Sequence, residues 1–294
     1  MPNSIQLAQN FTDLLDEVYK NASVTADLIS DASIVKAGVN ANEIAYPQID
    51  MSGLGDYDRN SGYTDGAVNL EYKTTQFNYD RGTKLSVDVM DDEETAGIAF
   101  GRLGAELQRT KVAPEADAFT FATIAGTDGV ATVEEDIADG EEFLTALLTA
   151  KNVLDEAEVP EDERYLYATP TLMNGILALD TYKSKEVLNS FSVKKSVPQS
   201  RFYTKIDLLD GKSTGETVGH YRKSEDGLDI NFMIIHKPAI IKFDKHVASD
   251  VINPKDNAAS DAYILKYRKY GIVDVYQNKA AGIYVSHKAA PVSE

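Results

Sequence analysis

The chain has 294 residues, no cysteine, and a net charge of −18 from 29 basic and 47 acidic side chains. The lack of cysteine excludes disulfides, thiolate metal sites and a cysteine nucleophile, and it fits maturation in a reducing cytoplasm. The whole charge imbalance lies in residues 1–150, because residues 151–294 carry equal numbers of acidic and basic side chains. Specific nucleic-acid binding is not expected, because it depends on lysine and arginine contacts to phosphate.

The first 45 residues are expected to form an N-terminal arm. Apolar residues recur near helical spacing over residues 4–30, which indicates a helix or an arm that packs on a neighbour. The N-terminus has no basic region followed by an apolar run, so no signal peptide is predicted. No run of about 18 apolar residues occurs, so no membrane span is predicted either.

Residues 46–90 are predicted to form a long β-hairpin. Polar residues alternate with Val68, Leu70 and Tyr72, and this period of two is typical of half-buried strands. A bend rich in glycine, aspartate and tyrosine precedes them. A ribbon of this length is not stable alone, so it needs a surface to lie on, in its own chain or in a neighbour.

A long helix is predicted next. Phe100, Leu103 and Leu107 belong to an apolar stripe at helical spacing, and Arg102 forms an i,i+4 pair with Glu106. Asp and Glu residues precede the stripe, where the helix dipole favours negative charge. Pro114 interrupts the pattern, so we expect one long helix with a bend there.

The second half of the chain has the pattern of an α/β subdomain followed by strands. A clear helix covers residues 141–157, and Arg164–Ala168 is expected to be a short buried strand before a helix opened by Pro170. Strands are predicted again over residues 229–247 and 261–288, with a turn at Gly271. Since strands precede and follow the long helix, the chain is expected to leave one subdomain and return to it.

The sequence contains no recognisable catalytic or metal-binding pattern. The four histidines, His220, His236, His246 and His287, lack metal-ligand spacing. The run Gly211–Thr214 resembles the end of a phosphate-binding loop, but the upstream glycine, strand and helix are missing, which favours a hairpin turn. No catalytic residue, cofactor or metal site is therefore predicted. The classes of function that remain are binding and assembly.

The order of these elements resembles that of the major capsid proteins of tailed bacteriophages, which have the Hong Kong-97-type shell fold. Five ordered segments carry the resemblance: 56–63 for the extended loop, 79–95 for the return strand and the start of the spine helix, 113–119 for the middle of that helix, 164–170 for the strand-to-helix step of the axial domain, and 261–276 for the closing strands. The likeness covers most of the chain, although no single segment is diagnostic.

The resemblance implies an α+β fold with five segments. They are an N-terminal arm (1–45), an extended β-hairpin loop (46–90), the spine helix with the first part of the peripheral domain (91–139), an axial α/β domain (140–247) and returning strands of the peripheral domain (248–294). Candidate inter-subunit contacts lie on the loop and the spine: Asp56, Tyr57, Asp58, Arg59, Tyr63, Glu93, Glu94, Arg102 and Arg109.

The function that the resemblance implies is a non-enzymatic shell protein without cofactors. Copies of the chain would assemble as hexamers and pentamers into the icosahedral head of a virion in the host cytoplasm, around double-stranded DNA that is enclosed without specific binding. A separate scaffolding protein is expected, because only about 45 residues precede the hairpin; a portal and, optionally, decoration proteins are further partners. Three alternatives remain: an encapsulin-like nanocompartment shell, a carbohydrate-binding or adhesion module suggested by 16 tyrosines, and a carboxylate-dependent hydrolase.

Overall fold

The computed structural model describes residues 23–30, 36–37, 43–60, 62–94, 98–214, 216 and 219–290. Most of the helix predicted over residues 4–30 lies outside these ranges. The strands are β1 (Lys36–Ala37), β2 (Glu43–Met51), β3 (Val68–Gln76), β4 (Tyr79–Asp88), β5 (Ala131–Glu134), β6 (Arg164–Ala168), β7 (Val193–Ser196), β8 (Ile206–Leu209), β9 (His220–Lys223), β10 (Ile230–His236), β11 (Ile240–Ile252), β12 (Ala262–Val275) and β13 (Ile283–His287).

The α-helices are α2 (Val89–Glu94), α3 (Ile98–Leu107), α4 (Ala113–Ala125), α5 (Gly140–Glu156), α6 (Pro170–Ala178) and α7 (Tyr182–Asn189). Short 3₁₀ turns are η1 (Ala26–Leu28), η4 (Gln199–Arg201), η5 (Lys237–Ala239), η6 (Pro254–Asp256) and η7 (Gln277–Gly282), and η3 (Gln108–Val112) is a π-helical segment.

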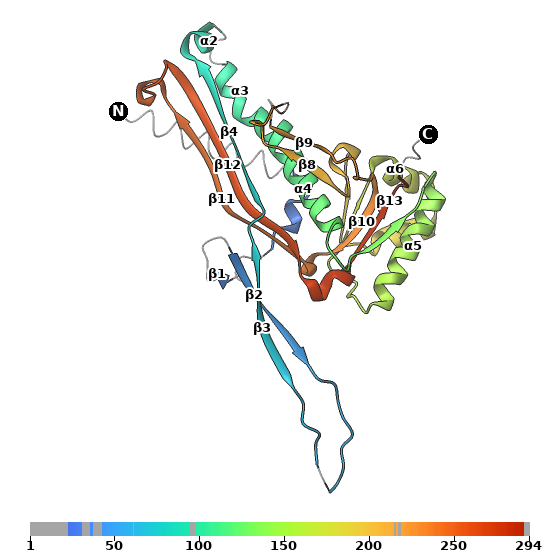
Figure 1. The fold of residues 1–294 in the computed structure, drawn as a ribbon. Helices are drawn as coiled ribbons and strands as arrows, with labels where there is room; N and C mark the ends of the chain where they lie inside the picture. Colours follow the sequence, from blue (N-terminus) through green and yellow to red (C-terminus); the bar gives the residue numbers. More distant parts are fainter. Residues whose placement is uncertain are drawn as a thin grey trace.

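A five-stranded sheet with the order β5-β13-β10-β6-β7 forms the centre of one half of the molecule (Figure 1). Its central strand β10 alternates between two apolar layers, as a strand must. Phe232 and Ile234 pack with α5, α6 and α7, whereas Met233 and Ile235 pack with α4 on the other face. Covered on both sides, this sheet is the core of its half of the molecule.

The local elements predicted for this region are confirmed. All five residues of β6 are buried, and Pro170 opens α6 directly after it. Asp139 caps the start of α5, because its carboxylate accepts hydrogen bonds from the backbone N–H groups of Glu141 and Glu142, each at 2.9 Å. This capping satisfies two of the N–H groups that a helix start leaves without partners.

The second half of the molecule is a three-stranded sheet, β11-β12-β4, along which the long helix runs (Figure 1). Leu103 and Leu107 of α3 pack against Leu265 of β12. The helix continues from α3 through η3 into α4, and the π-helical segment η3 ends two residues before Pro114. The irregularity therefore falls where the sequence predicted an interruption, because proline lacks the N–H that an α-helix requires.

Three details of the strands differ from the sequence predictions. β4 leaves the hairpin and pairs with β12 along its whole length. The turn predicted at Gly271 is wrong: this residue lies inside β12, where a Cβ would meet Asp244 Oδ1 at 2.8 Å. The final strand, β13, joins the five-stranded sheet between β5 and β10 rather than β11 and β12. The division of the chain into five segments stays a prediction.

Candidate inter-subunit surface

The hairpin of β2 and β3 projects far from the rest of the molecule (Figure 1). In the antiparallel register, residues directly opposite each other share a face of the ribbon. One face consists of apolar pairs at successive positions: Met51 with Val68, Ile49 with Leu70, and Pro47 with Tyr72. The opposite face carries polar pairs along the same stretch, Asp50 with Asn69 and Gln48 with Glu71. The hairpin is thus amphipathic across its thickness.

The apolar face is uncovered within the subunit. Five of its members have between about half and three quarters of their residue surface exposed: Leu70 53%, Tyr72 54%, Ile49 58%, Met51 69% and Val68 72%. Fully burying one large apolar side chain contributes about 1.5–3 kcal/mol. A contiguous strip of this kind marks an interaction surface.

The root of the hairpin, in contrast, is fixed to the body. Ile44 and Tyr46 are buried against Ile241 and Ile272, and the rings of Tyr46 and Tyr276 meet edge to face with centroids 4.9 Å apart. Because the root is packed, the position of the exposed strip is set by the body of the subunit.

The tip of the hairpin is held by contacts within the bend. The backbone groups of Asp58 and Gly62 exchange two hydrogen bonds, at 3.1 and 2.7 Å, and Gly62 adopts a φ of 80° that favours glycine. The rings of Tyr57 and Tyr63 lie with their centroids 4.8 Å apart. Both tyrosines are nevertheless exposed, as is Leu54, so the tip presents aromatic and apolar surface among carboxylates.

The predicted contact residues divide into two groups, one at the hairpin tip and the other on the helical region from α2 to η3, which lies away from the tip (Figure 1). The tip brings together the five loop residues, Asp56, Tyr57, Asp58, Arg59 and Tyr63. The other four lie on the α2–η3 helical region: Glu93, Glu94, Arg102 and Arg109.

The side chains of three residues in the second group, Glu93, Glu94 and Arg102, lie outside the described part of the chain. Arg109 is exposed and forms an ion pair with Glu106 at 2.7 Å. The sequence analysis paired Glu106 with Arg102, whereas the described contact of Glu106 is at i,i+3.

Sequence reasoning did not nominate Ile49 and Met51 as contact residues. Their strand, β2, contains Pro47, and proline argues against a strand in a single segment. The apolar face becomes evident only from the register, which pairs each of them with an apolar residue of β3. It could be found from the sequence only by aligning the two halves of the hairpin about its bend.

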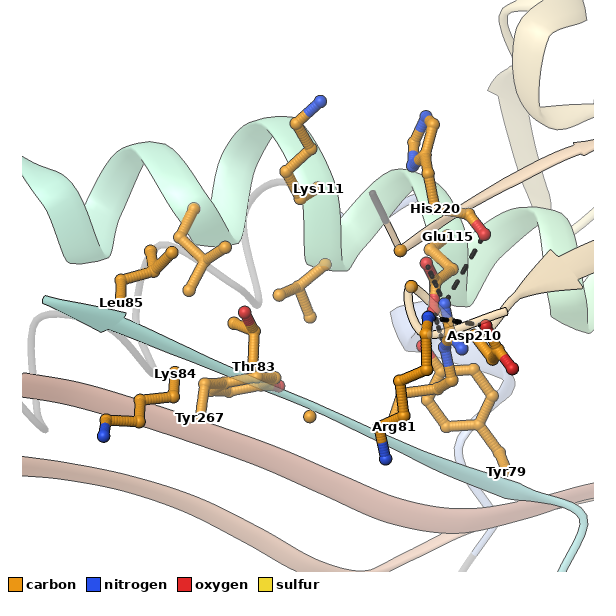
Figure 2. A pocket seen from close by; sticks show the side chains of 16 residues that line it. Tyr79, Arg81, Thr83, Lys84, Leu85, Lys111, Glu115, Asp210, His220 and Tyr267 are labelled. Atoms are coloured by element: carbon orange, nitrogen blue, oxygen red, sulfur yellow. Dashed lines mark hydrogen bonds and ion pairs between the residues drawn. The ribbon is translucent and has the colours of Figure 1, made fainter. Parts of the chain in front are cut away.

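A charged cluster connects the base of β4, the long helix and the β8–β9 hairpin (Figure 2). Arg81 donates to Glu115 through Nε at 2.6 Å and through Nη2 at 3.2 Å, and its Nη2 also donates to the Leu209 carbonyl at 2.8 Å. The hydrogen bond to Glu115 raises the pKa of Arg81. Tyr79 donates to the same carboxylate at 3.3 Å. Arg81 thus holds three separate elements together.

A second buried cluster fastens residues 23–30 to the body. The fully buried carboxylate of Asp117 accepts hydrogen bonds from Ser23 Oγ at 2.7 Å and Thr25 Oγ1 at 2.7 Å, and it forms an ion pair with Arg201 at 3.1 Å. Lys242 donates to the carbonyl of Thr25 at 3.0 Å, and burial lowers its pKa to about 8. These contacts fix residues 23–30 to the body.

Within the described ranges, no group of three or more histidine, aspartate or glutamate side chains is arranged to hold a metal ion. Among the same residues, no helix combines the length and the apolar character needed to cross a membrane.

Comparisons with protein-family models and with curated proteins find no match. Solved structures do match over nearly the whole chain. A chain of Mycobacterium phage Che8 is 14% identical with a TM-score of 0.60, covering 90% of each chain. The capsid structure of cyanophage P-SCSP1u is 14% identical with a TM-score of 0.59, covering 92% of this chain and 89% of the other.

A virus-like particle from Pyrococcus furiosus is 10% identical with a TM-score of 0.59, covering 95% of this chain and 99% of the other. At identities this low, the structural likeness shows a shared fold and nothing more. The chain therefore has the α+β Hong Kong-97-type capsid fold, as the order of its elements predicted.

Proposed function

We propose that the chain is the major capsid protein of a tailed phage, a non-enzymatic subunit of the icosahedral head shell around double-stranded DNA. The observation that carries the proposal is the uncovered apolar face of the β2–β3 hairpin, which a single subunit leaves in water. Laying this face on a neighbouring copy removes it from water. The shared capsid fold supports the same conclusion.

The arrangement suits assembly into rings. A projecting arm that contacts a different surface of the next copy makes a head-to-tail interface, and such interfaces close into rings when the rotation permits. Hexamers and pentamers are the rings proposed here. Each subunit then belongs to several contacts at once, so modest individual affinities add through effective concentration.

The proposed partners follow from this role. They are further copies of the chain, a separate scaffolding protein, a portal and, optionally, decoration proteins, and the protein is located in the virion head. The loop and helix residues nominated from sequence are proposed as inter-subunit contacts, together with the apolar strip of the hairpin. The DNA is proposed to be enclosed without specific binding, in keeping with the net charge of −18, which disfavours contacts to phosphate.

The test is the size of the purified protein, measured by light scattering on a sizing column and by negative-stain microscopy. Closed particles are expected, with a candidate scaffolding protein co-expressed where the chain alone stays monomeric. Monomers that persist with the scaffold and bind glycans would contradict the proposal and favour an adhesion module.

Deleting residues 54–66 is the matching variant. It removes the tip just beyond the Ser52–Ala67 backbone hydrogen bond of 3.0 Å, and so leaves the two strands connected. We expect an unchanged circular dichroism spectrum and loss of particles. Particles of normal size from this variant would show that the tip is dispensable.

A nanocompartment shell is the second candidate, because the Pyrococcus furiosus virus-like particle has the same fold. The contents of the particles separate the two functions: a phage head encloses DNA, and a nanocompartment encloses a cargo protein. Nuclease treatment followed by extraction of purified particles from the native source decides between them.

A further inference from the structure

Residues 23–30 are held on the body mainly by polar contacts, and we call them the clasp. None of these eight described residues belongs to a β-sheet, and Leu28 is their one buried apolar side chain. The η1 turn that carries Leu28 lies near the point where the hairpin joins the body (Figure 1). Parts of a protein with few buried apolar contacts open at a lower free energy than its core. The clasp therefore has the contacts of a segment that opens separately from the core.

The carboxylate of Asp117, on α4, holds the first residues of the clasp. It is fully buried and accepts five hydrogen bonds. Its Oδ1 accepts from Ser23 Oγ at 2.7 Å, from the Thr25 N–H at 3.2 Å and from Thr25 Oγ1 at 2.7 Å. Its Oδ2 accepts from the Val24 N–H at 3.0 Å and from Arg201 Nη1 at 3.1 Å. Both oxygens are thus used, and each of them contacts the clasp.

Lys242, on β11, contacts the clasp at two places. Its Nζ donates to the Thr25 carbonyl at 3.0 Å and also to the Thr25 hydroxyl. Its backbone carbonyl accepts from the Ser30 N–H at 2.9 Å, and its backbone N–H donates to Ser30 Oγ at 3.0 Å. Ser30 Oγ in turn donates to the carbonyl of Ile240 at 2.8 Å. The end of the clasp is therefore fastened to the first residues of β11.

The same residues of β11 support the root of the β2–β3 hairpin. Ile241 lies between the two residues that Ser30 contacts, and it packs with Ile44 and Tyr46 of β2. Ser30, Ile240 and Tyr46 also line one cavity of about 440 Å³. The clasp, the start of β11 and the hairpin root therefore adjoin one another, and the cavity beside them leaves space in which the root can shift.

The chemistry of the clasp contacts allows them to open to water. When the clasp leaves the body, the carboxylate of Asp117 and the ammonium of Lys242 exchange protein partners for water, so the net loss for each hydrogen bond is modest. A strand of the core such as β10 would instead expose apolar side chains, which water solvates poorly. The clasp can therefore open while the sheets stay folded.

We propose that residues 23–30 open and close as a unit on the folded body, and that the closed clasp holds the root of the β2–β3 hairpin in place. Closure fixes the start of β11 through Ser30, and β11 in turn packs against Ile44 and Tyr46. Opening frees this part of β11 on one side, so the hairpin gains freedom at its root. The clasp is a property of the single subunit, and only its consequence for assembly rests on the proposed function.

The natural absence of cysteine allows one introduced thiol to report each opening. Leu28→Cys probes the clasp, Ile44→Cys the hairpin root and Ile234→Cys the centre of the five-stranded sheet; the three side chains are at most 3% exposed. Unassembled subunits are treated with a thiol reagent, and labelling is followed by mass spectrometry. We expect the thiols of Leu28→Cys and Ile44→Cys to react at least roughly tenfold faster than that of Ile234→Cys.

The urea dependence of labelling distinguishes local opening from global unfolding. A local opening exposes little surface, so low urea concentrations are expected to change the rate for Leu28→Cys only slightly. The rate for Ile234→Cys is expected to rise steeply, because its thiol reacts only after the core unfolds. Equal rates and equal urea dependence at the two positions would overturn the proposal. Val24→Cys, a smaller change in the same segment, repeats the measurement if Leu28→Cys does not fold.

Asp117→Asn tests the link between the clasp and the hairpin root. Whichever way the amide lies, its NH₂ group faces donors of the clasp, so the closed state is weakened. We expect the thiols of Leu28→Cys and Ile44→Cys both to react roughly tenfold faster in this background. An unchanged rate at Ile44→Cys would overturn the link to the root. Thr25→Val, which removes the hydroxyl contacts at similar shape, replaces Asp117→Asn if that variant does not fold.

Asp226→Asn is the matched control. Asp226 forms an exposed ion pair with Lys205 at 3.0 Å, away from the clasp contacts, so the rates at both probe positions are expected to stay unchanged. A rise equal to that in Asp117→Asn would overturn the assignment of the effect to the clasp. All these rates are measured on single subunits. Failure of the unchanged chain to form particles with its scaffolding protein would therefore count against the shell function alone.

Discussion

The five-stranded sheet and the β2–β3 hairpin use the same strand chemistry with opposite outcomes. In β10, side chains that point to either face are covered by helices of the same subunit, and Phe232 and Ile234 are fully buried. In the hairpin, Ile49 and Leu70 stand opposite each other and are both more than half exposed. The first region stabilises the subunit, and the second is suited to stabilising contacts between subunits. The same alternation of apolar residues therefore has two outcomes: in β10 it builds the core of the subunit, and in the hairpin it leaves an exposed apolar face.

The largest effect on subunit stability is expected from Phe232→Ala. The ring is fully buried and packs against Phe143, with centroids 5.4 Å apart. Removing a buried phenylalanine costs about 3–5 kcal/mol. Chemical denaturation of the unassembled protein measures the loss of unfolding free energy. Tyr72→Ala on the hairpin is the matched control, and an equal loss there would contradict the contrast between the two regions.

Arg81→Gln is expected to have the next largest effect. It leaves the largely buried Glu115 without its cation and frees the β8–β9 hairpin from β4. Breaking such a pair costs about 2 kcal/mol at partial burial. Arg109→Gln removes an exposed ion pair and is expected to change stability by less than about 1 kcal/mol. Similar losses in both variants would show that the Arg81 cluster is no more than a surface contact.

The buried Lys242 predicts a pH dependence of stability. Its pKa in the folded protein is lowered to about 8, whereas an unfolded lysine titrates near 10.4. The unfolded chain therefore binds more protons between these values, so the unfolding free energy rises with pH above about 8. The rise amounts to about 1–2 kcal/mol by pH 9.5.

Lys242→Met reduces this rise, and the exposed Lys255→Met leaves it unchanged. The buried Lys269, beside Asp244, also has a lowered pKa and contributes a rise of the same sign. The Lys242→Met variant is therefore expected to keep part of the rise in unfolding free energy. Denaturation curves at pH 7–9.5 measure the effect. A stability that falls over this range in the wild-type chain would contradict the assignment.

The smallest stability effect and the largest assembly effect are expected together in Ile49→Asp. The side chain is 58% exposed, and surface substitutions usually change stability by about 0.5 kcal/mol or less. A carboxylate in the apolar strip would be buried without a partner in the assembled shell, so particles are not expected. Asn69→Asp adds the same charge on the polar face and is expected to assemble. Sizing-column light scattering compares the two.

Local patterns in the sequence predicted the local elements. The apolar run of Arg164–Ala168 and the proline that follows predicted β6 and α6, because a buried strand and a helix start each depend on residues close together in the chain. The ordered set of these elements was enough to predict the α+β shell fold. The bend that holds Tyr57 and Tyr63 could also be located, because turn residues mark a bend wherever it lies in the fold, whereas their nomination as contact residues came from the resemblance to the capsid family.

Long-range pairing decided the rest. The register that places Ile49 beside Leu70, the Arg81–Glu115 pair and the insertion of β13 into the five-stranded sheet join residues distant in sequence. The stability of each of these contacts depends on which two segments meet, and the sequence of one segment does not specify the other. The sequence by itself determined which residues are apolar and how they alternate. The tertiary structure decided which of those faces the subunit covers and which it leaves for another copy, because covering a face requires an element brought from elsewhere in the chain.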